Sequence, residues 1–258
     1  MASAGRGGIM KVYQYEEFPE MLIKVSNKKE YLEDLAQGKV FMNESGYFRK
    51  LDDTFRGDKF DGKYVVAMNS PEWCIKIGPT EDNPEVITIP GTNIKNFTRG
   101  FTGDDKIPIF CCTDMTEEIL EEPKNDSMAF KESFIKEMEQ FGSYYIIFSK
   151  MELIKKLYTY IQEHGFGGKW GPVSYKALDN PYDTSTMRND LNGYDAFFIK
   201  DISYKWQNEW RIILAPTTSP IITEKEHWHI ASIPPLDWFH IGEINELKTN
   251  KITVVPKE

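Results

Sequence analysis

Residues 205–214 combine reactive side chains with the two-residue period of a β-strand. On an extended chain, Gln207, Glu209 and Arg211 share one face, whereas the opposite face is apolar apart from Asn208. An amide and a carboxylate one pleat apart are the side chains of a catalytic Gln-x-Glu pair. The alternative is a solvated strand face with a structural Glu–Arg pair, as half-buried strands often have.

A second polar segment, residues 46–62, mixes arginines with aromatic side chains. The guanidinium groups of Arg49 and Arg56 present paired N–H groups that suit phosphate, and the ring of Tyr47 suits stacking on a flat ligand. The segment is therefore a candidate nucleotide-binding loop. The alternative is a charged surface loop whose phenylalanines anchor it to the core.

The elements that must position these residues follow from apolar periodicity and from helix start and stop signals. Helices are expected after Asn27 and Ser149, because a glutamate follows each by three positions in a capping box, with Gly38 and Gly165 as stops. A third helix is expected over residues 130–141. Strands are expected at residues 11–15, 39–42, 64–69, 74–77, 86–89, 107–112, 144–148, 172–176, 195–200, 204–214, 228–233 and 252–255. Helices in the middle and strands at both ends, without regular βαβ alternation, predict an α+β fold.

The composition indicates a folded chain of one main domain. Hydrophobic residues make up 40% and aromatic residues 14% of the 258 positions, enough for a substantial core. We expect a flexible leader at residues 1–10 and a single catalytic-type domain over residues 11–258. Within that domain, the proline- and glycine-rich residues 78–105 are expected to form an irregular insertion or a lid.

Charge and cysteine content exclude several classes of partner. A net charge of −9 gives no general attraction to phosphate backbones or anionic lipid. The three cysteines have no framework spacing, which favours a reducing compartment and a cytoplasmic location. No apolar run approaches the roughly 18 residues of a membrane span, and the start lacks the apolar core of a signal peptide, so no membrane partner is expected.

Three segments together resemble a family of bacterial and phage proteins that is known as a domain of unknown function and is often linked to defence. The segments are residues 31–62, 173–175 and 198–212. The first contains Phe-Arg-Gly-Asp-Lys-Phe-Asp-Gly at 55–62, similar to the family's Phe-Asn-Asp-Pro-Phe-Glu type signature, with Arg56-Gly57 in place of Asn and Lys59 in place of Pro. The third reads Phe-Ile-Lys-Asp at 198–201 and Trp-Gln-Asn-Glu-Trp-Arg-Ile at 206–212. The resemblance covers roughly residues 11–214.

The resemblance implies split β-sheets with flanking helices, similar to ADP-ribosyltransferases, and NAD as the substrate. The catalytic Gln/Glu-x-Glu motif of those enzymes maps onto Gln207 and Glu209. Glu209 would hold the ribose hydroxyl and stabilise the positive charge of the transition state. Gln207 would position the attacking group of the acceptor.

The resemblance also implies a set of cofactor-binding side chains. Arg56 or Arg49 would bind the pyrophosphate, and Tyr47 or Tyr15 would stack on a ring. The complete set is Arg56, Arg49, Tyr47, Tyr15, Asn43 and Asp58. Two departures from the transferase pattern stand out. Residues 13–15 read Tyr-Gln-Tyr where an Arg or His is usual, and residues 41–45 are the nearest match to a Ser-Thr-Ser motif.

Three functional hypotheses remain open. The first is a mono-ADP-ribosyltransferase that acts as a toxin or phage-defence effector on a nucleic acid, with RNA favoured, or on a protein, and that an antitoxin restrains. The second is a non-catalytic ligand- or partner-binding protein of a defence or toxin–antitoxin system, with Arg56 and Arg211 in the pocket. The third is a metal-dependent nuclease. Its carboxylates would be Asp52, Asp53, Asp58 and Glu209.

Overall fold

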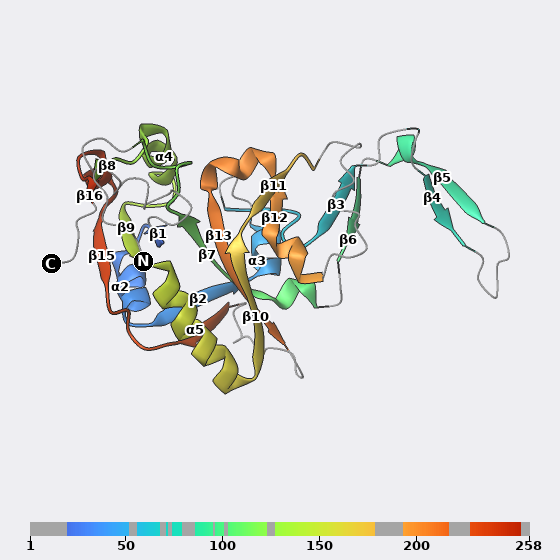
Figure 1. Cartoon of the computed structure of the whole chain (residues 1–258). Helices are drawn as coiled ribbons and strands as arrows, with labels where there is room; N and C mark the ends of the chain where they lie inside the picture. The colour runs from blue at the N-terminus through green and yellow to red at the C-terminus, as the bar shows by residue number, and fades with distance from the viewer. Residues whose placement is uncertain are drawn as a thin grey trace, which may run out of the picture.

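The computed structural model describes a mixed helix and strand fold of the α+β class (Figure 1). It describes residues 20–51, 56–67, 71, 74–78, 86–94, 96–100, 103–122, 127–178, 193–216 and 228–253. The expected leader and the expected strand at 11–15 lie outside these residues. Tyr15, Asp52 and Asp53 lie outside them as well.

A mainly antiparallel sheet of eight strands forms the centre of the fold. Six strands lie side by side in the order β10 (Phe166–Pro172), β13 (Glu209–Pro216), β7 (Pro108–Asp114), β1 (Met21–Ser26), β9 (Tyr144–Ser149) and β15 (Phe239–Glu243). The other two, β2 (Lys39–Glu44) and β14 (Trp228–Ser232), pair with each other, and β2 also pairs with β7. Because β7 has three partner strands, the sheet must branch there.

The branch is a fork along one edge of β7. The opposite edge pairs with β13 from Glu209↔Thr113 to Ile213↔Ile109. On the forked edge, β1 pairs with the end of the strand at Asp114 and Thr113, and β2 pairs with its start at Ile109 and Pro108. Among the described residues, positions 110–112 have no strand partner on this edge. The chain between the two prongs is α2 (Lys29–Ala36), which lies beside the opening.

Helices cover both faces of the sheet. Leu32 and Leu35 of α2 and Leu153 and Leu157 of α5 (Lys150–His164) pack in one core with sheet residues such as Trp210. The other face packs against α4 (Glu132–Met138) and the 3-10 turn η6 (Ile244–Lys248) in a second core. A third core packs the 3-10 turn η4 (Gly193–Phe198) on β7 and β13. None of the helices in the described part of the chain is long and apolar enough to cross a membrane.

The helix signals were correct for one helix and partly wrong for another. Ser149 caps α5 as predicted, because its hydroxyl accepts the backbone N–H of Glu152 at 3.2 Å, and Gly165 ends the helix with a φ of 66°. The predicted capping box at Asn27 is wrong: α2 has Lys28 as its N-cap and no side-chain capping bond. Its stop at Gly38 is confirmed by a φ of 88°.

Three segments near the candidate site differ from prediction. The strand expected at 195–200 is mostly the 3-10 turn η4, and only its last two residues belong to a strand, β12 (Ile199–Asp201). Residues 46–62 are not wholly a loop, because α3 (Ser45–Lys50) forms within them. The expected strand at 204–214 begins only at Glu209, because residues 202–207 form the 3-10 turn η5 (Ile202–Gln207). Asn208 separates the two with a φ of 41°, a conformation that asparagine tolerates better than most residues.

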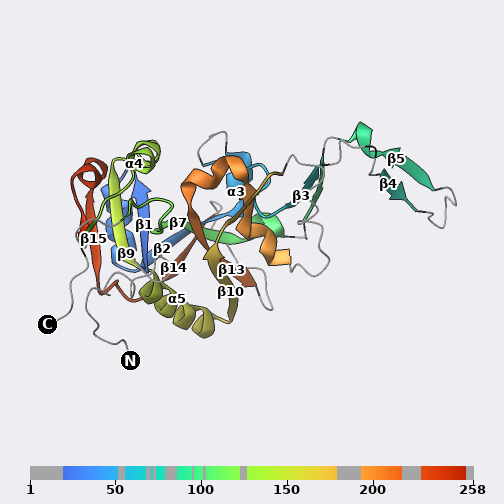
Figure 2. The same cartoon turned by 45° about the horizontal axis from the view of Figure 1, so that its top comes forward.

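Two antiparallel ribbons extend from one end of the sheet (Figures 1 and 2). The first pairs β3 (Tyr64–Ala67) with β6 (Asn96–Arg99), and the second pairs β4 (Cys74–Ile77) with β5 (Ile87–Pro90). Within the range 78–105, the strand predicted at 86–89 is present as β5, and β6 is a second strand that was not predicted. The remaining elements are η1 (Gly91–Asn93), η2 (Asp104–Lys106), β8 (Ser127–Met128), β11 (Ser174–Lys176), β12 (Ile199–Asp201) and β16 (Ile252–Thr253).

Gly38, where α2 turns into β2, is expected to tolerate no side chain. A Cβ there would lie 2.0 Å from the carbonyl oxygen of Ile233. We expect Gly38→Ala to lower the free energy of unfolding by about 2 kcal/mol or more in urea denaturation, because strain and a backbone clash add. Gly103→Ala is the matched control, since Gly103 also has a positive φ of 84° but no atom within 4 Å of the added Cβ. If both variants lose the same free energy of unfolding, the structure around residue 38 must have moved to relieve the clash.

Candidate functional site

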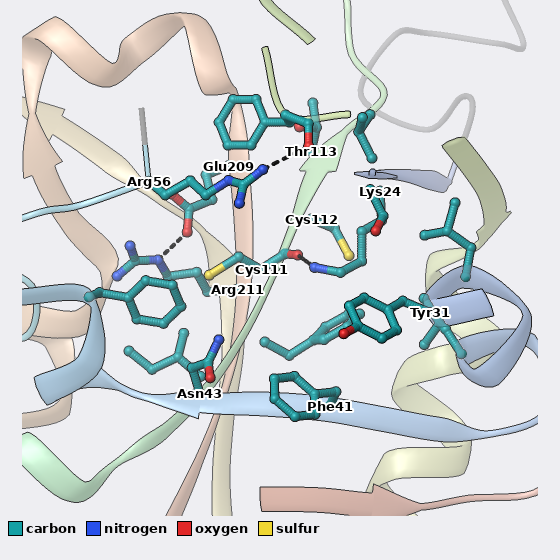
Figure 3. Close-up of a pocket in the computed structure, with 18 of the residues that line it drawn as sticks. Lys24, Tyr31, Phe41, Asn43, Arg56, Cys111, Cys112, Thr113, Glu209 and Arg211 are labelled. Atoms are coloured by element: carbon teal, nitrogen blue, oxygen red, sulfur yellow. Dashed lines mark hydrogen bonds and ion pairs between the residues drawn. The ribbon is translucent and has the colours of Figure 1, made fainter. Parts of the chain in front are cut away.

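A cavity of about 880 Å³ occupies the fork of the sheet. Residues of β1, α2, β2 and β7 line it, together with the start of β13 and the end of α4. Its volume lies in the range of ligand-binding pockets. Figure 3 shows Glu209, Arg211 and Arg56 on one side of this cavity and Tyr31 on the other, with Cys111 between them.

Lys24 of β1 occupies the opening of the fork. Its Nζ donates a hydrogen bond to the carbonyl oxygen of Cys111 at 2.7 Å and lies 4.7 Å from the centre of the Phe110 ring. The ammonium group thus satisfies a β7 carbonyl at the point where the strand ladder is interrupted. An ammonium has three donors, so Lys24 also brings positive charge and further N–H groups to the centre of the cavity.

A buried ion-pair network forms the wall around Glu209. The Arg211 guanidinium donates through Nε to Glu209 Oε1. It also donates to both oxygens of Asp61, at 2.9 and 3.0 Å, and to the carbonyl oxygen of Phe197 at 2.7 Å. Arg211 is 1% exposed and Glu209 is 6% exposed, so the strand face is not solvated, but the Glu–Arg pair of that alternative is present.

Lys200 connects the two residues of the predicted Gln-x-Glu pair. Its Nζ donates to Gln207 Oε1 at 2.8 Å and to Glu209 Oε2 at 2.7 Å. Gln207 is not on the strand, yet its side chain still lies next to Glu209 through this shared lysine. The hydroxyl of Tyr175 accepts the backbone N–H of Glu209 at 2.8 Å and holds the start of β13 in place.

The network determines which groups are charged. Burial by itself would raise the pKa of Glu209, but the charges of Arg211 and Lys200 outweigh burial and hold this pKa well below its usual range. Burial and the nearby Glu209 carboxylate raise the pKa of the Cys111 thiol. Cys111 therefore stays protonated and hydrogen-bonds to Glu209, which makes it a poor nucleophile.

Aromatic side chains form an exposed shelf at the other end of the cavity. Tyr31 is 60% exposed and Phe41 is 46% exposed, although both line the cavity. The rings of Phe41 and Trp228 lie 5.5 Å apart between centroids. Large rings left open to solvent at a concave site are suited to stacking on a flat ligand.

The cavity is basic even though the whole chain is acidic. Its lining has six basic side chains, Lys24, Lys28, Lys39, Arg56, Lys200 and Arg211, against two acidic ones, Asp34 and Glu209. Lys39 is paired with Asp34 at 2.7 Å, and Glu209 is paired as described above. The remaining positive charge, together with the aromatic shelf, fits a ligand that carries both phosphate and flat rings.

Arg56 links the 56–62 segment to Phe141, which follows α4 in the chain. Its Nη2 donates to the carbonyl oxygen of Phe141 at 2.8 Å, and the guanidinium lies 5.8 Å from the Phe141 ring centre. The neighbouring Gly57 carbonyl accepts the hydroxyl of Tyr204 at 2.9 Å. The segment is thus anchored by contacts to two other parts of the chain.

The structure brings most of the predicted site residues together. Glu209, Gln207, Arg56, Tyr47 and Asn43 all line the cavity. Two predicted residues do not line it. The Arg49 guanidinium instead donates to the carbonyl of Asp61 at 2.6 Å and to Asp104 Oδ1 at 3.1 Å, and Asp58 is buried behind the wall. Tyr15 lies outside the described residues.

Sequence reasoning missed Lys24, Lys200 and Asp61. Lys24 lies on β1, whose short apolar run gives no clear period. Lys200 was visible only inside the quoted motif at 198–201, where nothing in a single sequence marks it as the partner of Glu209. Asp61 comes from a segment 150 positions away from Arg211. A local pattern carries no signal for such a contact.

Neither metal clusters nor known relatives help to define the site. Within the described residues, no group of three or more His, Cys, Asp or Glu side chains is arranged to hold a metal ion. Comparison with protein-family models, curated proteins and solved structures found no match for this chain.

Proposed function

We propose that the protein binds NAD in the cavity at the fork and transfers its ADP-ribose to an acceptor. The observation that carries the proposal is that Glu209, Gln207 and Arg56 line one cavity with a lysine at its centre and aromatic rings at its far end. A fixed carboxylate, a cation and stacking surfaces are the three features that a dinucleotide with a scissile ribose bond requires.

In the proposed reaction, the bond between ribose C1′ and the nicotinamide nitrogen breaks, and its electron pair leaves with nicotinamide. The ribose becomes a cation that Glu209 stabilises electrostatically. An oxygen or nitrogen of the acceptor then forms the new bond to C1′ and loses its proton to solvent. Gln207 lies close enough to Glu209, through Lys200, to orient that acceptor.

The same geometry suggests how the rest of NAD would lie. The ribose next to nicotinamide would face Glu209, the pyrophosphate would lie near Lys24, and adenine would stack on Phe41 and Tyr31. Lys24 and Arg56 are thereby the proposed phosphate ligands, where the resemblance implied either Arg56 or Arg49. Arg49 is not a phosphate ligand in this proposal, because its guanidinium already donates hydrogen bonds to Asp61 and Asp104.

The acceptor in this proposal is a nucleic acid or a protein, and RNA is favoured. The exposed Tyr47, at 41%, adds a further ring at the cavity edge on which a base of a single strand could stack. The role as a cytoplasmic toxin or phage-defence effector, with an antitoxin as partner, rests on the resemblance to the defence-linked family alone.

One observation favours a second candidate, a non-catalytic nucleotide-binding protein. Both carboxylate oxygens of Glu209 are occupied by cations in this structure, Oε1 by Arg211 and Oε2 by Lys200. A carboxylate that stayed in this state would stabilise a ribose cation poorly. Under this reading NAD or a related nucleotide binds, and no nicotinamide is released.

The proposal predicts that Lys24→Met weakens the use of NAD. Loss of a charge-assisted bond to phosphate, worth about 1.5–3 kcal/mol, should raise the KM for NAD about 10-fold or more. The kcat should change little, because this bond is present in the ground state and the transition state alike. The measurement is nicotinamide release from NAD with cellular RNA or lysate protein as acceptor.

Lys155→Met is the matched control, since Lys155 is exposed on α5 and does not line the cavity. If NAD binds but no nicotinamide is released with any acceptor, the result supports the second candidate, a non-catalytic nucleotide-binding protein. If the folded wild type neither binds nor consumes NAD, the proposed function is wrong.

A further inference from the structure

The wall of the cavity around Glu209 and the residues directly behind it contain a cluster of buried charged side chains whose charges do not balance. Its members are Asp58, Asp61, Lys200, Glu209 and Arg211, each at most 6% exposed. The cluster contains three carboxyl groups and two cations. One carboxyl group therefore has no full ion-pair partner within it.

Arg211 is held in one position by its contacts. Its Nε donates to Glu209, its Nη1 to Asp61 and to the Phe197 carbonyl, and its Nη2 to Asp61. The two bonds to Asp61 form the planar, two-pronged pairing that guanidinium and carboxylate groups prefer. Movement of Arg211 would break several buried bonds at once.

Lys200 is less constrained. Its ammonium donates to Gln207 and Glu209, and it lies 4.9 Å from the centre of the Tyr204 ring. A lysine side chain has four rotatable bonds and three equivalent donors, so its charge moves between acceptors at little steric cost. Of the two cations in the cluster, Lys200 is the one that is able to change partner.

Asp58 is the carboxylate of the cluster that has an unsatisfied oxygen. Its Oδ1 accepts the backbone N–H of Phe60 at 2.9 Å, whereas its Oδ2 is buried and has no hydrogen-bond partner among the described residues. An unsatisfied buried carboxylate oxygen costs stability, and such groups are rare in folded proteins. Because Asp58 lies directly behind the wall of a cavity, this unsatisfied oxygen makes it a candidate for a functional role.

Tyr204 connects Lys200 to the segment that carries Asp58, because Lys200 Nζ lies 4.9 Å from the centre of its ring and its hydroxyl donates to the carbonyl of Gly57, next to Asp58, at 2.9 Å. Burial and the neighbouring Asp61 raise the pKa of Asp58 to about 6, while Lys200, the Phe60 N–H and Arg211 lower it. Tyr204 faces the same group and stays neutral, because burial and Asp58 raise its pKa.

We propose that Asp58 is the second ion-pair partner of Lys200, which moves from Glu209 to Asp58 when a ligand hydroxyl reaches Glu209. The catalytic meaning of this exchange rests on the proposed function. The exchange frees Glu209 Oε2 for the ribose and removes one of the two positive charges beside it. Asp58 acts as a positioning residue in this scheme, because it affects the reaction only through Lys200.

The exchange needs an ionised Asp58. Below about pH 6 the Asp58 carboxyl is protonated and cannot receive Lys200, so the kcat for NAD should fall on the acid side of that value. Asp58→Asn should lower kcat and remove this acid limb from the pH profile.

A titration of Asp58 by carboxyl carbon NMR tests the exchange without any ligand. In Glu209→Gln the carboxylate that competes for Lys200 is absent, so Lys200 should pair with Asp58 and lower its pKa by at least about 1 relative to wild type. An unchanged or higher pKa of Asp58 in folded Glu209→Gln would overturn the proposal.

Two further variants make the result secure. Glu209→Asp keeps the negative charge but moves the carboxylate one methylene away from Lys200. The pKa of Asp58 should therefore fall by less than it does in Glu209→Gln. If it does not fall at all, the exchange is contradicted. Glu152→Gln removes an ion-paired carboxylate on α5, bonded to Lys156 at 2.6 Å, and should leave the Asp58 titration unchanged. Absence of NAD turnover in wild type would contradict the proposed function alone, because this titration does not depend on NAD.

Discussion

Arg211→Met should lower the free energy of unfolding at pH 7 by about 3–5 kcal/mol, because it leaves two buried carboxylates without their shared cation. The side chains of Asp61 and Glu209 are only 2% and 7% exposed, so water cannot replace the guanidinium. Methionine fills a similar volume, and the loss therefore reports charge rather than a cavity. Urea denaturation of wild type and variant measures it.

The loss should depend on pH in a defined direction. The pKa of Glu209 in the folded wild type lies below its ordinary value of 4.5, so its contribution to stability is present above that value and declines as pH falls below it. In Arg211→Met the part of this contribution that comes from Arg211 is absent, and only Lys200 still favours the charged form of Glu209. The difference in stability between wild type and variant should therefore stay constant from pH 7 to about pH 4.5 and shrink as the pH falls further.

A surface ion pair provides the control for Arg211→Met. Lys248 and Glu139 are paired at 2.7 Å, with side chains 49% and 38% exposed. Lys248→Met should change the free energy of unfolding by less than about 1 kcal/mol. If Arg211→Met also lowers the free energy of unfolding by less than about 1 kcal/mol, water or another cation must reach Asp61 and Glu209 in that variant.

Glu209→Gln should reduce the kcat for nicotinamide release by about 100-fold or more, the usual effect of removing one group that stabilises transition-state charge. The amide has nearly the shape of the carboxylate but cannot stabilise the ribose cation. The KM for NAD should change little, since Lys24 and the aromatic shelf bind other parts of the ligand. Steady-state kinetics with the best acceptor found for wild type give both constants.

Glu152→Gln serves here as the matched control and should keep the wild-type kcat, because Glu152 lies on α5 outside the cavity. If wild type consumes NAD and Glu209→Gln does so equally well, Glu209 has a structural role and another group supports the ribose cation. Circular dichroism of both variants must first show that each is folded.

The segment 205–214 shows how far local pattern could predict the site. Its alternation correctly placed Glu209 and Arg211 on one face. Asn208 was the only break in the apolar alternation, and the strand begins just after it. There its side chain donates to the Asp114 carbonyl at 2.7 Å and to Thr116 at 2.8 Å. These bonds to a distant segment explain why Gln207 ends a 3-10 turn.

The fork of the sheet could not be predicted, because β1 was missed. Residues 21–26 read Met-Leu-Ile-Lys-Val-Ser, a short apolar run that is compatible with either a strand or a buried helix. Leu22 and Ile23 are both buried, each in a different core on an opposite face of the sheet. Only a central strand, covered on both faces, has this pattern of burial.

The sequence by itself determined the α+β class and elements such as α5, β7 and β9, because capping residues and apolar periods depend on neighbours a few positions apart. The tertiary structure decided that the polar face of β13 is buried and that Lys200, Glu209 and Arg211 meet. Arg211 pairs with Asp61 across 150 positions of sequence. Such contacts arise from chain folding as a whole, so no local pattern records them.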